Sequence, residues 1–155
     1  MEQSDQELTK LGLPELAHRD HAPSKPGNTI FSTESVSIYY GSFKRAGAEL
    51  GVESFGLQVF DMPAGNDQYP EHDHSEDGQE EVYVTLRGSG DWDIEGERVH
   101  VDPETLVRIS AGTKRKLLPG PEGIRVLALG GVPGKLYERP EPFKLGAPDP
   151  TATAA

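Results

Sequence analysis

Apolar and polar residues alternate along most of the central part of the chain. Successive side chains of a strand point to opposite faces, so a period of two predicts short strands with one buried face. Turn residues, mainly glycine and proline, separate these segments, as is typical of antiparallel strands. The predicted strands cover residues 35–40, 54–62, 81–86, 91–94, 98–101, 106–109, 115–118 and 124–129.

Short strands at regular spacing, with no long amphipathic helix among them, predict an all-β domain built as an antiparallel barrel or sandwich. We expect this domain to span residues 31–140. Residues 1–30 contain leucines that are interrupted by Gly12 and Pro14, which predicts an N-terminal arm with at most one short helix. Residues 141–155 are rich in proline and poor in apolar side chains, which predicts a flexible C-terminal tail.

The composition then excludes several classes of function. The 155 residues include 26 acidic and 15 basic side chains, a formal net charge of −11. Nucleic-acid binding needs a cluster of Lys and Arg, and the densest one here is only Lys114-Arg115-Lys116, so no nucleic-acid partner is expected. No apolar run is long enough for a membrane helix and no signal-peptide pattern is present, so we expect a cytoplasmic protein without a membrane partner. The absence of cysteine excludes thiolate chemistry.

A possible metal-binding pattern follows Pro70. His72 and His74 are two residues apart, so on a strand both imidazoles point to the same face. The next predicted strand opens with Glu80 and Glu81, and antiparallel pairing can bring one of these carboxylates beside the histidines. Two imidazoles and one carboxylate on one side of an ion leave open positions, as in non-haem iron and related divalent-metal sites. The alternative is that the histidines only hydrogen-bond acidic neighbours.

These residues resemble the first motif of the cupin superfamily, in which a glycine precedes a His-x-His pair, and a glutamate and a second glycine follow. Here Gly65 is followed by six residues and His72-Asp73-His74, while Glu81 is followed by six residues and Gly88. The match at Gly88 favours Glu81 as the carboxylate ligand, although a strand shifted by one residue would turn Glu80 inward instead. The interval between His74 and Glu81 is six residues, longer than is usual in the family.

The resemblance covers roughly residues 35–131. It implies a double-stranded β-helix, or jelly-roll, barrel with one divalent transition-metal ion (iron, manganese, nickel, cobalt, copper or zinc) on His72, His74 and Glu81. The implied function is a metal-dependent enzyme of oxygenase, isomerase or decarboxylase type, with dioxygenase-like chemistry first, acting on a small molecule that can be anionic. The alternative is a non-catalytic, metal-free module that binds a small molecule.

The second cupin motif matches only at Gly112, and Arg115 stands where many members of the family carry a third histidine ligand. Arginine remains cationic and does not ligate metals. Three arrangements are therefore open. Arg115 could lie beside a bound metal and grip an anionic group of the substrate. It could pair with Glu81 in a metal-free pocket, or it could face solvent with its basic neighbours.

Alternation along the predicted strands adds further candidates. Tyr83 shares the face of Glu81, and Gln58 lies on a neighbouring predicted strand, so both are expected to bind substrate together with Arg115. Tyr83 and Arg115 are also the candidates for catalysis. The alternative for Tyr83 is a purely structural residue whose hydroxyl is hydrogen-bonded inside the domain.

The opposite face of the same strand is apolar. Val82, Val84 and Leu86 alternate with Glu81 and Tyr83, so they are expected to point away from the pocket. An exposed apolar face of this kind favours packing against another sheet or a second copy of the chain. Because cupins are commonly dimeric, the resemblance also implies a homodimer.

Overall fold

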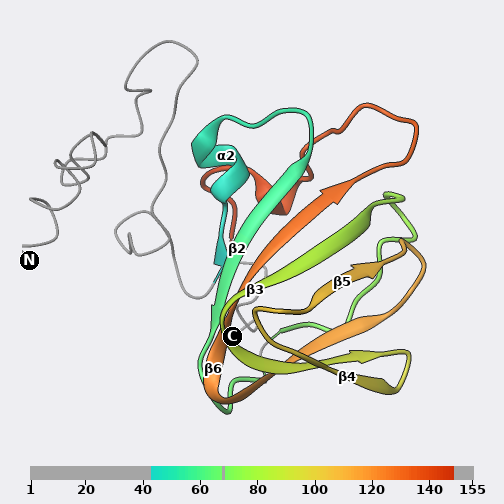
Figure 1. The fold of residues 1–155 in the computed structure, drawn as a ribbon. Helices are drawn as coiled ribbons and strands as arrows, with labels where there is room; N and C mark the ends of the chain where they lie inside the picture. The colour runs from blue at the N-terminus through green and yellow to red at the C-terminus, as the bar shows by residue number, and fades with distance from the viewer. Residues whose placement is uncertain (1–42, 68, 149–155) are drawn as a thin grey trace, which may run out of the picture.

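The computed structural model describes residues 43–67 and 69–148, and this part of the chain is almost entirely antiparallel β-structure (Figure 1). The all-β prediction is therefore confirmed. The N-terminal arm predicted over residues 1–30 and the strand predicted over 35–40 lie outside the described residues. The elements are β1 (Phe43–Lys44), α2 (Ala46–Leu50), β2 (Gly56–Met62), β3 (Glu80–Ile94), β4 (Glu97–Val101), β5 (Leu106–Ile109), β6 (Arg115–Gly131) and the 3-10 turn η1 (Glu141–Phe143).

The long strands β3 and β6 hold the sheet together. The strand order is β1-β2-β6-β3-β4, and β5 also pairs with β3. β3 and β6 pair from Glu80 opposite Gly131 to Ile94 opposite Arg115. One half of this ladder is flanked by β2 and β5, whereas the other half is flanked by β4. The two bent strands therefore contribute to both parts of the fold, which diverge in Figure 1.

Two segments that the sequence predicts as turns are instead internal parts of these long strands. The pairs of strands predicted at 81–86 with 91–94, and at 115–118 with 124–129, are the continuous strands β3 and β6. The register shifts between Gly88 and Gly90, as at a β-bulge. Gly88 has a φ of +74°, and a Cβ there would lie 2.1 Å from the carbonyl oxygen of Gly123. Glycine therefore allows a close approach of two strands, a role that gives the same sequence signal as a turn.

Aromatic side chains dominate the core on the inner face of the sheet. Trp92 is 1% exposed, and its ring centroid lies 4.1 Å from that of Tyr83. Phe60 packs against Tyr69 and Tyr83, with ring centroids 5.3 and 6.5 Å apart. Burial of a large side chain of this kind contributes about 2 kcal/mol. This cluster is continuous with the candidate site described below.

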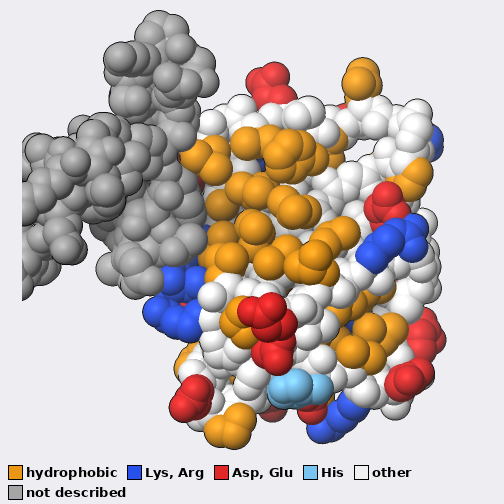
Figure 2. All heavy atoms as spheres, viewed as in Figure 1, with side chains coloured by type: hydrophobic (Ala, Val, Ile, Leu, Met, Phe, Trp, Pro, Cys, Tyr) orange, Lys and Arg blue, Asp and Glu red, His pale blue; other side chains and the backbone are white. Residues whose placement is uncertain are grey.

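The outer face of the same strands is also apolar. Two rows of opposed residues cross it. In the first row, Leu57 lies opposite Leu129, and Leu129 lies opposite Val82. The second row runs in the same way through Val59, Leu127, Val84 and Leu106. Figure 2 shows hydrophobic side chains gathered on this side of the molecule, and Leu106 is 68% exposed. The predicted outward direction of Val82, Val84 and Leu86 is confirmed by their burial pattern. We call the following residues the outer patch: Leu57, Val82, Val84, Leu86, Leu106, Leu127 and Leu129.

Residues 141–148 pack onto the β-domain. Phe143 stacks on Phe43 with ring centroids 5.6 Å apart. Arg45 Nε donates a hydrogen bond of 2.9 Å to the carbonyl oxygen of Pro142, and in Figure 1 the C-terminal segment runs beside α2. Residues 141–148, which the sequence assigns to a flexible tail, therefore make tertiary contacts that their composition alone does not predict. Within residues 43–67 and 69–148, no helix has the length and apolar character needed to cross a membrane.

Candidate metal centre

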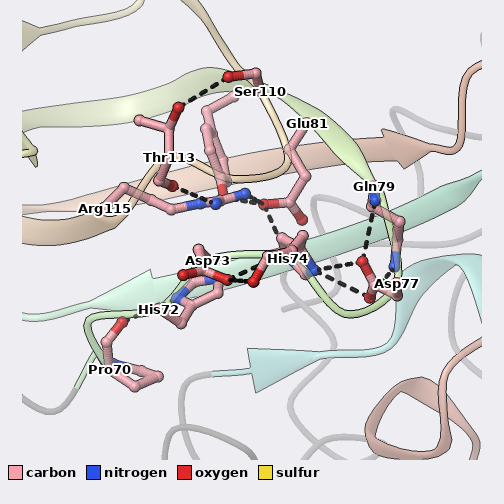
Figure 3. Close-up of polar contacts among 12 residues, drawn as sticks. Pro70, His72, Asp73, His74, Asp77, Gln79, Glu81, Ser110, Thr113 and Arg115 are labelled. Carbon is pink, nitrogen blue, oxygen red and sulfur yellow. Dashed lines mark hydrogen bonds and ion pairs between the residues drawn. The ribbon is translucent and has the colours of Figure 1, made fainter.

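The segment between β2 and β3 carries the two histidines, and a backbone bridge holds it against the start of β6. His72 N–H donates to the Arg115 carbonyl at 3.1 Å, and Arg115 N–H donates to the His72 carbonyl at 3.0 Å. The backbone N–H of His74 donates to the carbonyl of Ala111 at 2.7 Å. Directly opposed residues of an antiparallel pair project their side chains to the same face. The side chains of His72 and Arg115 therefore both point into the site (Figure 3).

His72, His74 and Glu81 converge at this point. One ligand atom from each residue lies within 4.8 Å of the others, and the two imidazole centroids are 5.2 Å apart. Alternation along β3 turns Glu81 inward, where it is 7% exposed. Glu80 faces outward and accepts a hydrogen bond of 2.7 Å from Arg108 Nε. The structure therefore brings together the favoured set of three residues and leaves Glu80 apart from it.

The outer nitrogen of each imidazole is held by an acceptor. His72 Nδ1 lies 3.0 Å from the carbonyl oxygen of Pro70, and His74 Nδ1 lies 3.1 Å from both carboxylate oxygens of Asp77. Asp77 is held in turn by the backbone N–H and the side-chain amide of Gln79, at 3.0 and 2.9 Å. Acceptors of this kind place the proton on Nδ1 and leave Nε2 as the inward lone pair, as is usual for histidine metal ligands.

The inner nitrogen of His74 shows that the donor set fits a cation. His74 Nε2 is buried without a hydrogen-bond partner, although it lies 3.2 Å from Glu81 Oε2. Two lone pairs that face each other at this distance repel unless a proton or a metal ion lies between them. Imidazole nitrogen and carboxylate oxygen are ordinary ligands of divalent transition metals. The three residues could therefore hold such an ion.

The pKa values of the two histidines are shifted in opposite directions. Burial lowers the pKa of His72, and the positive charge of Arg115 lowers it further, so this ring is neutral at neutral pH. Burial also disfavours the charged form of His74, but the carboxylates of Glu81 and Asp77 outweigh burial and raise its pKa. Without a metal, a proton on His74 Nε2 relieves the repulsion from Glu81.

Arg115 is 0% exposed and is paired with Glu81. Its Nη2 donates to Glu81 Oε2 at 2.8 Å, its Nη1 to the carbonyl of Thr113 at 2.8 Å, and its Nε to the Tyr83 hydroxyl at 3.2 Å. The alternative in which Arg115 faces solvent is therefore wrong, since the bridge to His72 fixes its direction. The guanidinium does not line the adjoining cavity, and its expected contact with an anionic group of the substrate stays a prediction.

Glu81 is ionised despite its burial. Burial by itself raises the pKa of this carboxyl, but His74, the Tyr83 hydroxyl and Arg115 together lower it to about 2. Tyr83 donates a hydrogen bond to Glu81 Oε2, and burial raises the pKa of its phenol well above 10. Tyr83 therefore stays protonated and orients the carboxylate. The contacts with His74, Tyr83 and Arg115 all use Oε2, which leaves Oε1 for another ligand.

A cavity of about 150 Å³ opens beside these side chains. Gln58 and Tyr83, both expected in the pocket, line it together with the three converging residues. The sequence analysis missed most of its aromatic walls. Tyr69 directly precedes the Pro70 that opens the histidine motif, and this position could have identified it. Pro70 itself also lines the cavity, and the remaining wall residues come from segments distant in sequence: Phe43, Phe60, Ala128, Pro142 and Phe143.

Comparison with solved structures identifies the fold that carries this site. No family model and no curated protein sequence matches the chain. A solved cupin protein from Bacteroides fragilis matches with a TM-score of 0.55 and 21% identity, over 72% of this chain and 93% of that chain. Two weaker matches are a putative sugar phosphate isomerase from Acidithiobacillus ferrooxidans (TM-score 0.49, 19% identity, 65% and 73% of the two chains) and the DMSP lyase DddQ from Ruegeria pomeroyi.

The lyase matches with a TM-score of 0.46 and 26% identity, over 55% of this chain and 42% of that chain. This chain therefore spans less than half of the lyase's length. The Bacteroides fragilis structure, by contrast, is matched over nearly its whole length. With the antiparallel strand order described above, this match confirms the predicted jelly-roll architecture, and the chain has the fold of the cupin superfamily.

Proposed function

We propose that this chain is a small metal-dependent enzyme, which holds one divalent transition-metal ion on His72, His74 and Glu81 and acts on a small molecule in the adjoining cavity. The observation that carries the proposal is the convergence of their ligand atoms within 4.8 Å, with both Nδ1 atoms held by outer acceptors. When bound, the ion supplies Lewis-acid or redox chemistry. Oxygenase, isomerase and decarboxylase reactions all remain within the proposal.

Neighbouring residues of the chain would hold the metal ligands in place. Asp77 holds the His74 ring, while Tyr83 and Arg115 hold one oxygen of Glu81 and leave the other free. The aromatic walls of the cavity keep water away from a bound substrate. The charge of Arg115 offsets that of Glu81, so we expect weaker metal binding than in a site with a third histidine.

A metal-free binding module is the second candidate, and one observation favours it. The Arg115 guanidinium already supplies a cation 2.8 Å from Glu81, at the sequence position where many cupins carry a third histidine ligand. In that case the cavity binds a small molecule without transforming it. Both candidates include the expected homodimer, which the exposed outer patch supports.

Metal content distinguishes the two candidates. Untagged protein purified without chelator should carry about one divalent ion per chain. Added iron, manganese, nickel or zinc should raise the Tm, by an amount equivalent to about 2.7 kcal/mol at a hundredfold excess over the Kd. His72→Ala and Glu81→Ala should lose both effects. His100→Ala is the matched control, because His100 pairs with Asp91 at 3.0 Å on the exposed surface. Wild-type protein without metal and without a Tm shift would support the second candidate.

A further inference from the structure

Gln58 is a buried side chain with an unused amide. It lies in β2 and is 5% exposed, yet neither its amide nitrogen nor its amide oxygen has a hydrogen-bond partner in the described part of the chain. Buried polar groups almost always have partners, because burial without one destabilises the fold. The observation does not depend on which way the amide is turned, because both ends are unpaired. Gln58 also lines the cavity together with His72 and Glu81, so a ligand there lies beside this side chain.

The register of the sheet explains this position. Gln58 lies opposite Ala128, and Ala128 lies opposite Tyr83, so their side chains form one row on the inner face of β2, β6 and β3. Ala128 contributes only a methyl group, and it lines the cavity between its two larger neighbours. Gln58 and Tyr83 therefore line the cavity on either side of this small residue.

The other walls restrict the kind of molecule that fits. Apart from the proposed metal ligands and two tyrosines, the lining side chains are Phe, Pro and Ala, so Gln58 supplies the remaining polar side-chain atoms. The nearest cation, Arg115, is bound to Glu81 and does not reach the cavity wall. A volume of about 150 Å³ accommodates a molecule of the size of benzene. Without a bound metal ion, the cavity therefore suits a small and largely apolar ligand without a full negative charge.

We propose that the Gln58 amide determines specificity at this site, and that the substrate is a ring-sized molecule with a hydrogen-bond donor and acceptor side by side. A carboxamide, or a hydroxyl beside a carbonyl, has this pattern. The glutamine amide offers an acceptor oxygen and donor N–H groups in one plane, so it makes two bonds to such a group. A ligand without the pair leaves the amide unsatisfied and binds less well. This inference rests on the proposed function, since it takes the same cavity as the substrate site.

A set of four ring-sized probes tests the proposal: benzamide, acetophenone, toluene and benzoate. Each is titrated into the full chain and into Gln58→Leu, with affinity measured by ligand-detected NMR and calorimetry. Wild-type protein should bind benzamide about tenfold more tightly than toluene, and Gln58→Leu should lose this preference. The Tm of Gln58→Leu should be unchanged or higher, because the variant removes an unpaired amide, whereas loss of a merely structural residue lowers the Tm. If Gln58→Leu does not fold, Gln58→Met takes its place in the experiment, because methionine keeps an unbranched side chain.

The possible results separate this inference from the proposed function. Equal benzamide-to-toluene ratios in wild type and variant, tighter binding of benzoate than of benzamide by the metal-free protein, or no binding by any probe would each overturn the inference. If the protein binds metal but shows no amide preference, the proposed function stands and the inference falls. If the amide preference is present in protein that binds no metal, the inference is supported and the metal-dependent function is overturned.

Discussion

His72 and Arg115 face each other across a backbone bridge, and this pairing places the Arg115 guanidinium beside Glu81 of the candidate metal centre. The buried charge is tolerated because Glu81 accepts a hydrogen bond from it at 2.8 Å. Removal of one partner of a buried ion pair is costly, since the other charge stays buried without compensation. Arg115 therefore affects both the stability of the fold and the affinity of the site for cations.

Replacement of this arginine by histidine should convert the centre to one with a third imidazole. We expect Arg115→His to bind zinc or nickel at least tenfold more tightly than wild type, because a repelling cation becomes a ligand. Without metal, the variant should lose about 3 kcal/mol of stability, because Glu81 loses its partner. Calorimetric titration and urea unfolding with and without chelator measure the two effects. Equal metal affinity in wild type and variant would contradict this account.

The carboxylate behind His74 should tune metal binding without contacting the metal. Asp77→Asn keeps the shape of the side chain but weakens its hold on the His74 Nδ1–H, so we expect metal affinity to fall by about tenfold to a hundredfold. The neighbouring variant Glu76→Gln removes the same charge from an exposed position and should have little effect. Competition with a metal-chelating dye compares the two variants. A similar change in both would show that general charge, and not orientation of His74, is responsible.

Metal binding should release a proton from His74. Burial disfavours its charged form, but Glu81 and Asp77 raise its pKa above the ordinary 6.5, so the metal-free protein retains this proton to a higher pH than an ordinary histidine does. Affinity should therefore increase with pH and level off once the pH exceeds the raised pKa. Calorimetry at pH 7 in buffers with different ionisation enthalpies measures the protons released, with up to one expected per ion. Identical enthalpies in all buffers would argue against His74 as a ligand.

Asp61 should stabilise the domain above its own pKa. It accepts a hydrogen bond of 2.6 Å from Arg125 Nε and lies 3.0 Å from Lys44 Nζ, and both of these cations are buried. Burial raises the pKa of Asp61, but the two cations outweigh burial and lower it below 3.8. Its contribution should therefore be present above about pH 4 and lost as the pH falls through the lowered pKa.

Urea unfolding of Asp61→Asn tests this contribution. We expect a loss of about 1–2 kcal/mol at pH 7, since the carboxylate is partly exposed, and a smaller loss at pH 3. Asp91→Asn is the control, because it breaks the exposed pair with His100 and should cost less than about 0.5 kcal/mol. A loss that does not shrink at low pH would show that the charge of Asp61 is not the cause.

The outer patch should form the interface of the expected homodimer. Leu106→Glu places a charge in the patch at a residue that is 68% exposed, so the change should weaken association without unfolding the chain. Leu136→Glu is the matched control at a residue that is 93% exposed and outside the patch. Analytical ultracentrifugation should find a dimer for wild type and Leu136→Glu, and a monomer for Leu106→Glu. A monomeric wild type would remove the basis for the dimer.

The alternation of side chains along a strand was sufficient to predict which candidate metal ligands lie together. His72 and His74 share a face because they are two residues apart, and the position of Gly88 correctly favoured Glu81 over Glu80. The direction of Arg115 was not predictable, because it depends on the bridge to a residue more than forty positions away. Local patterns carry no information on the register of such a long-range pair.

Glycine and proline misled the prediction in a different way. The segment around Gly88 has the composition of a turn, but its glycine serves a close approach to Gly123 within continuous strands. Phe143 was assigned to a flexible tail, because its stacking partner Phe43 is distant in sequence. In both cases the deciding contact is tertiary, and neither hydrophobic periodicity nor composition encodes it.

The stacking of Phe143 on Phe43 has an evolutionary consequence. These rings belong to segments that flank the main strands, yet both line the cavity. Substitutions there can widen or narrow the cavity without disturbing the ladder of β3 and β6, which carries Glu81. Descendants of this chain could thus acquire new ligands through mutations in these flanking segments, while the reactive chemistry is inherited unchanged.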